Sequence, residues 1–153
     1  MNRRQLIEEI KDTQRGITKV KDKYVSEENL ELNYITIFSH DQNEFEELTK
    51  TAEKIGEKIS KHNGPIFKLK KNLKFDNGTL KIFRIRKPDT ERPQKGCGDF
   101  KVSNYKKFKD KYLQKNNFLL FKGNGYEFLG IHDLKEDYLV YFPDKPLTEE
   151  FGI

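Results

Sequence analysis

The chain has 153 residues and a formal net charge of +5, enough for one domain or two very small repeated modules. Its single cysteine excludes an internal disulfide framework and a multi-thiolate metal site. No run approaches about 18 apolar residues, which excludes a membrane span. The 12 Phe and 7 Tyr supply large buried area, so most of the chain is expected to be ordered. We expect a cytoplasmic protein, because no apolar signal segment follows Arg3 and Arg4.

The positive charge is concentrated in the middle of the chain. Residues 65–111 carry 15 basic and 5 acidic side chains, whereas residues 1–64 and 112–153 are both net acidic. Such a segment favours an anionic partner, either an anionic small molecule or nucleic acid. A lysine-rich solubilising surface is the alternative interpretation.

The first 30 residues are predicted to form a helical arm. Gly16 weakens the pattern in its middle, so we expect one interrupted helix or two short ones. The apolar positions at near-helical spacing are Leu6, Ile10, Ile17, Val20 and Tyr24.

A strand over 32–38 and then a long helix are predicted next. The strand is rich in β-branched and aromatic residues. Asp41 and Glu44 have the spacing of a capping box, and the stop signal is the sequence at 63–65. The spacing therefore predicts a helix of about five turns over 41–63. Its apolar stripe is Phe45, Leu48, Ala52, Ile55 and Ile59.

Two alternating runs, 66–75 and 80–86, flank an Asp-Asn-Gly turn and predict a hairpin. Residues 89–98 have no periodicity and are predicted to connect two halves. Cys97 lies between two glycines there, and a small residue packed at a tight turn is favoured over a nucleophile because no base is evident.

A second cycle follows the connector. It contains a strand over 99–102, a helix capped by Ser103 or Asn104, and strands over 118–121, 126–131 and 138–142, with a loop from Pro143 onward. The predicted fold is α+β, with two βαβββ-like modules (31–88 and 99–153) forming a curved mixed sheet. A kink near Asn72 could split the first hairpin arm and complete the first module. The alternative is an α+β sandwich without internal symmetry.

The element order and several landmarks resemble the vicinal oxygen chelate (glyoxalase-like) superfamily, and more closely its YecM-like branch of metal-binding proteins of unsettled function. The landmarks are Asn33-Tyr34-Ile35-Thr36-Ile37, Gly64-Pro65-Ile66-Phe67-Lys68-Leu69, Phe83-Arg84-Ile85-Arg86-Lys87-Pro88 and Gly96-Cys97-Gly98-Asp99-Phe100-Lys101-Val102. The resemblance implies paired βαβββ modules around a metal held by two His and one Glu.

The metal ligands of that branch are not retained in this sequence. The corresponding positions are Asn33 or Tyr34, Arg84, and Asp99. A guanidinium cannot be deprotonated to bind a cation and repels it, so we predict no metal and no cofactor. His40, His62 and His132 lie far apart in sequence, without a second ligand at helical spacing, and no catalytic residue is assigned.

Arg84 and Arg86 are predicted to point to the same side of their strand. If that side is the concave face, Arg84, Arg86 and Asp99 form a binding site for an anion, with both arginines at least half-buried and paired to Asp99 or another carboxylate. We therefore expect a non-catalytic binding module for an anionic small ligand or nucleic acid, without a membrane partner.

Two further observations bear on this hypothesis. Four aromatic residues interleaved with the basic ones favour base stacking: Phe67, Phe75, Phe83 and Phe100. The alternative is a metal-dependent enzyme of the oxygen chelate type that draws on Asp99, Glu127 and His132.

Overall fold

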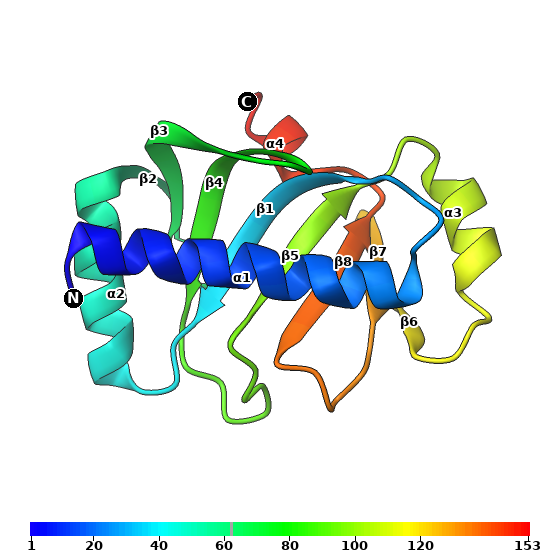
Figure 1. Cartoon of the computed structure of the whole chain (residues 1–153), viewed down its shortest axis with the longest axis horizontal. Coiled ribbons are helices and arrows are strands. Elements are labelled where there is room, and N and C mark those ends of the chain that lie inside the picture. Colours follow the sequence, from blue (N-terminus) through cyan, green and yellow to red (C-terminus); the bar gives the residue numbers. More distant parts are fainter. Residues whose placement is uncertain (62) are drawn as a thin grey trace.

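The computed structural model describes residues 1–61 and 63–153, which form one mixed sheet with its main helices on one face (Figure 1). The helices of this part of the chain are α1 (Arg3–Tyr24), α2 (Gln42–Ile55), α3 (Tyr105–Tyr112) and α4 (Leu147–Glu150). The strands are β1 (Glu31–Phe38), β2 (Gly56–Ser60), β3 (Ile66–Phe75), β4 (Gly78–Arg86), β5 (Gly96–Lys101), β6 (Phe118–Gly123), β7 (Tyr126–Ile131) and β8 (Tyr138–Pro143).

The strand order β2-β3-β4-β1-β5-β8-β7-β6 contains the same arrangement twice. In each half the first strand pairs in parallel with the last one, β1 with β4 and β5 with β8, and the other two strands follow outward. The halves meet through the antiparallel pair β1–β5. The predicted α+β fold of two βαβββ modules is therefore confirmed, and it is the vicinal oxygen chelate fold that the resemblance implies.

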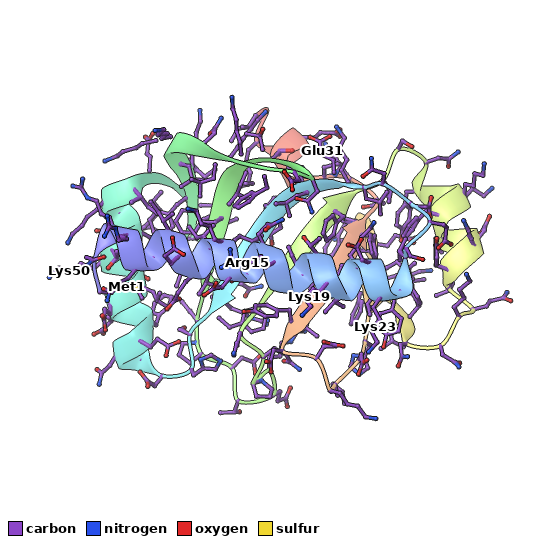
Figure 2. The ribbon with its side chains drawn as sticks, in the orientation of Figure 1. Met1, Arg15, Lys19, Lys23, Glu31 and Lys50 are labelled. Atoms are coloured by element: carbon purple, nitrogen blue, oxygen red, sulfur yellow. The ribbon has the colours of Figure 1, made fainter. Side chains whose placement is uncertain are left out.

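α1 is one uninterrupted helix that crosses the sheet between α2 and α3 (Figure 1), and the predicted break at Gly16 is wrong. The helix begins with a capping box between Asn2 and Gln5. Gly16 is needed for packing, because a Cβ there would lie 2.2 Å from the ring of Tyr138. The exposed side of the helix carries Arg15, Lys19 and Lys23 (Figure 2).

The glycines of β5 let α1 approach the centre of the sheet. The strand begins at Gly96, three residues before the expected start. A Cβ on Gly98 would lie 2.1 Å from Cδ1 of Ile17, which is fully buried in α1. Cys97 therefore lies within a strand, not at a tight turn.

The long helix predicted over 41–63 is wrong in its second half. Asp41 caps α2 by accepting from the backbone N–H of Glu44, but the helix ends at Ile55 and residues 56–60 form β2. Gly56 is extended there and lies close to the Lys68 carbonyl, so Ile59 belongs to the sheet. This strand completes the first module. β3 has a register shift between Lys68 and Leu73, near the expected kink, but is not split into two strands.

The segment after Pro143, expected to be a loop, contains α4. It crosses the sheet face opposite α1 and packs Leu147, Phe151 and Ile153 against Tyr34 and Ile82. Asn33 Nδ2 donates to Thr148 Oγ1 at 2.7 Å, and the Thr148 N–H donates back to Asn33 Oδ1 at 3.3 Å. In the described part of the chain, every helix is too short or too polar to cross a bilayer.

We expect Gly98→Ala to lower the free energy of unfolding by about 1–3 kcal/mol, because the new methyl group overpacks the space that Ile17 fills. Ile17→Val removes Cδ1 and alone costs about 0.5–1.5 kcal/mol. The double variant should lose less free energy of unfolding than the two single variants lose together. Urea denaturation measures these losses. Additive losses would show that the two sites are not in contact.

Candidate anion-binding site

A cavity of about 440 Å³ lies on the sheet face opposite α1. Its floor consists of alternate residues of the four central strands, and the segment after β8 forms one wall. The floor residues are Tyr34, Thr36, Phe38, Arg84, Arg86, Cys97, Asp99 and Tyr141. The three residues predicted to bind a ligand, Arg84, Arg86 and Asp99, all line this one cavity. A shallower hollow of about 370 Å³ adjoins it at Arg86 and Asn63.

Strand register determines how the floor is arranged. Thr36 of β1 lies opposite Arg84 on one side and opposite Cys97 on the other. Asp99 of β5 lies between Tyr34 of β1 and Tyr141 of β8. The arginines and Asp99 are therefore on opposite sides of β1.

Arg84 is half-buried and lies over the ring of Tyr34, with Cζ 5.8 Å from the ring centroid. Its Nε is buried and has no hydrogen-bond partner, and in the described residues no carboxylate lies within 4.0 Å of the guanidinium. The expected ion pair with Asp99 or another carboxylate is thus absent from residues 1–61 and 63–153, because β1 separates Arg84 from Asp99. A half-buried guanidinium without a paired carboxylate is costly for the protein alone.

Arg86 is held differently. Its Nη2 is 3.3 Å from Oδ2 of Asp89, and its Cζ lies 5.0 Å from the ring centroid of Phe38. The side chain is 21% exposed. Arg86 is therefore partly neutralised by its own loop, and of the two arginines Arg84 is the one free to pair with an incoming anion.

Burial favours the neutral, protonated form of the Asp99 carboxyl group. Desolvation raises the pKa of this carboxyl to about 7, although the Arg84 guanidinium acts in the opposite direction. Near neutral pH, Asp99 therefore exists in both protonation states. In its neutral form it adds a hydrogen-bond donor to the floor and leaves the charge of Arg84 uncompensated.

The thiol of Cys97 is not activated. It is 7% exposed, and burial raises its pKa to about 12. Desolvation also raises the pKa values of Tyr34 and Tyr141, the latter to about 12. These groups stay protonated at neutral pH and supply polar or aromatic surface rather than a nucleophile.

The residues present do not fit the divalent metal that the fold family implies. Within residues 1–61 and 63–153, no group of three or more His, Cys, Asp or Glu side chains could hold a metal ion. Asp99 is the carboxylate on the cavity floor, and the guanidiniums of Arg84 and Arg86 share that floor. Two fixed positive charges beside one partly protonated carboxyl disfavour a cation.

The other candidate metal or catalytic residues lie elsewhere or are already paired. His132 is exposed, His40 contacts Glu44 and the Gln94 carbonyl, and His62 lies outside the described residues. Glu127 borders the cavity, but its carboxylate is 2.9 Å from Lys109 Nζ and 2.7 Å from the Tyr105 hydroxyl. The geometry therefore does not bring Asp99, Glu127 and His132 together as metal ligands.

Sequence analysis missed an aromatic wall at the second-module end of the cavity. Tyr126 and Phe128 of β7 and Tyr141 of β8 border the cavity. The ring of Phe128 lies 5.1 Å from that of Tyr141 and 6.3 Å from that of Tyr126, measured between centroids. The alternation of Tyr126 and Phe128 along a strand is the signal that could have identified this wall.

Comparisons with known proteins support the fold and nothing finer. No family model matches the sequence, and no curated protein matches it. The chain is similar in structure to a protein described as "Structural Genomics, Protein EC4020", with a TM-score of 0.67 and 16% identity over 91% of this chain and 87% of that one. The membership in the YecM-like branch stays a prediction.

Two other solved structures are more distant. One is a glyoxalase/bleomycin resistance protein/dioxygenase superfamily member from Vibrio splendidus 12B01, with a TM-score of 0.44, 10% identity, and coverage of 74% of this chain and 97% of that one. The other is the hypothetical protein BH1468 from Bacillus halodurans C-125, with a TM-score of 0.42, 12% identity, and coverage of 77% and 96%.

Asp99 should make the folded protein less stable as the pH rises. Its pKa is raised in the folded state from an ordinary value of 3.8 to about 7, so the folded chain binds more protons than the unfolded chain between these values. The free energy of unfolding should fall from about pH 4 to pH 7 by up to a few kcal/mol. Asp99→Asn should remove this fall in urea denaturation series.

Asp110→Asn is the matched control, because Asp110 is exposed on α3. The control should keep the pH profile of the wild type. If Asp99→Asn has the same profile as the wild type, the carboxyl is not desolvated in the folded protein.

Proposed function

We propose that this chain is a non-catalytic binding module that holds an anionic small ligand in the concave cavity of its glyoxalase-like fold. The observation that carries the proposal is Arg84, a half-buried guanidinium at the cavity floor whose Nε has no partner. An anion at this place would supply the missing hydrogen-bond acceptor and the missing charge, and charge-assisted hydrogen bonds are stronger than neutral ones.

Arg86 and Asp99 support the same ligand. Arg86 adds a second positive charge on the same face, and Asp99, when protonated, can donate a hydrogen bond to an anion. The protonated Cys97 thiol and the absence of a metal-ligand cluster in residues 1–61 and 63–153 favour binding without catalysis.

A small ligand fits this site better than nucleic acid does. The cavity volume of about 440 Å³ is in the range typical of small-molecule sites. Three of the aromatic rings expected to stack on bases, those of Phe67, Phe83 and Phe100, are fully buried in the core and cannot contact a nucleic acid. The many lysines of the central segment, such as Lys68 and Lys70, lie on the exposed side of β3.

Arg84→Gln should weaken the binding of inorganic phosphate about tenfold or more, because it removes a charge-assisted contact. Binding can be followed by the NMR signal of the Arg84 Nε–H in the wild type and by calorimetry in the variants. Lys107→Gln, on the exposed face of α3, is the control and should leave the affinity unchanged. The affinity should also decrease with added salt.

Three results would contradict the proposal. The first is the absence of any phosphate-dependent change at the Arg84 Nε–H. The second is an oligonucleotide that binds in a salt-dependent way without sensitivity to Arg84→Gln, which would favour the nucleic-acid hypothesis. The third is a stoichiometric divalent ion in the purified protein, which would favour the metal-dependent enzyme.

The two arginines should affect stability in opposite directions. At pH 5, where Asp99 is protonated, Arg84→Met should leave the free energy of unfolding unchanged or raise it by about 1 kcal/mol, since it removes a half-buried charge without a paired carboxylate. Arg86→Met breaks the contact with Asp89 and should lower it by about 0.5–1 kcal/mol. Thermal and urea denaturation of both variants measure this. A large loss for Arg84→Met would show that the residue is structural.

A further inference from the structure

The aromatic wall adds a second recognition surface to the cavity. The ring of Phe128 is parallel to that of Tyr126, with an angle of 1° between their planes, and nearly perpendicular to that of Tyr141. Phe121 stacks behind Phe128 at 5.0 Å and supports it. The cavity therefore has one aromatic end built on the second module, which Glu127, Asp144 and Lys145 also border.

This wall is accessible to a ligand. Tyr126 is 53% exposed and Phe128 is half-buried, although both are large aromatic residues. Exposed aromatic surface at a concave site is costly in water unless a ligand covers it. Pro143, the cross-strand neighbour of Phe128, and Leu147 of the C-terminal segment also border the cavity.

The aromatic end and the cationic end meet within the same cavity. Arg92 Nη1 donates to the Tyr141 hydroxyl at 3.4 Å, so Tyr141 is the ring of the wall that lies next to a positive charge. β4, which carries Arg84, is separated from β7, which carries Phe128 and Tyr126, by β1, β5 and β8, which corresponds to about 19 Å between backbones. Because the arginine side chain extends over part of this distance, the two ends can contact opposite ends of one small molecule.

We propose that the ligand is an anion that carries an aromatic ring, with its charged group on Arg84 and its ring against Phe128 and Tyr126. The inference rests on the proposed function and names the chemical class of the ligand. A flat ring is favoured over a bulky aliphatic group because aromatic rings stack on, or contact the edge of, other aromatic rings, as those of Phe128, Tyr126 and Tyr141 do with one another.

Three probes with the same charged group test the inference: phenyl phosphate, cyclohexyl phosphate and inorganic phosphate. Phenyl phosphate should bind about tenfold more tightly than inorganic phosphate, as expected for one stacked ring, and more tightly than cyclohexyl phosphate. Affinities are measured by calorimetry on the full chain at constant salt and pH.

Variants test whether the preference for phenyl phosphate comes from the aromatic wall. Phe128→Leu should abolish the preference for phenyl phosphate and leave the affinity for inorganic phosphate unchanged, whereas Arg84→Gln should weaken both. Phe45→Leu, on α2 and away from the cavity, is the matched control and should change neither. If Phe128→Leu does not fold, as judged by circular dichroism, Tyr126→Leu gives the same test at an exposed position.

The outcomes separate the two proposals. If inorganic phosphate binds at Arg84 but phenyl phosphate binds no more tightly, the aromatic ligand class is wrong and the proposed function stands. If phenyl phosphate is preferred but neither Phe128→Leu nor Tyr126→Leu changes the preference, the wall is not the ring site. If none of the three probes binds, both proposals are wrong.

Discussion

The antiparallel pairing of β1 with β5 at the centre of the sheet is the constraint on which both faces of the molecule depend. On one face of β5, Gly96 and Gly98 carry no side chain, so Ile17 of α1 packs directly against the backbone and the helix spans both modules. On the other face, alternation turns Cys97 and Asp99 toward the cavity. The six residues of β5 thus pack against the N-terminal helix on one face and form part of the cavity floor on the other.

The two modules share a topology but use their concave faces differently. Over the first module, the C-terminal segment covers part of the concave face with Leu147, Phe151 and Ile153, and Arg84 and Arg86 remain on the cavity floor. Over the second, the concave face stays open and carries aromatic rings. The two modules thereby give the cavity two different ends. The desolvated groups Arg84 and Asp99 lie on the central strands between these ends. The core beneath α1 must offset the cost of holding these two groups away from water.

The strands other than β2, and the two-module order, were predictable, because alternation and turn residues are local signals. The C-terminal end of α2 was not predictable, because Ile59 continues the apolar stripe of the helix. Only the contacts of Gly56 with β3 show that residues 56–60 form a strand. At the site, alternation along the strand predicted that Arg84 and Arg86 lie on one side of β4. It could not predict that this side is the concave one, because that depends on α1 covering the other side. The missing partner of Arg84 was also beyond prediction, because it depends on the strand that intervenes before Asp99.

The packing of Gly16 against the ring of Tyr138 joins a residue near the beginning of the chain to one near its end. During synthesis on the ribosome, α1 emerges before the strands on which it packs, and its capping box stabilises its first turn. Ile17 of this helix reaches its place against Gly98 only when β5 has been made, and Gly16 meets Tyr138 only when β8 has been made. The second half of α1 therefore docks on strands that follow much later in the sequence, and folding depends on contacts between distant parts of the chain.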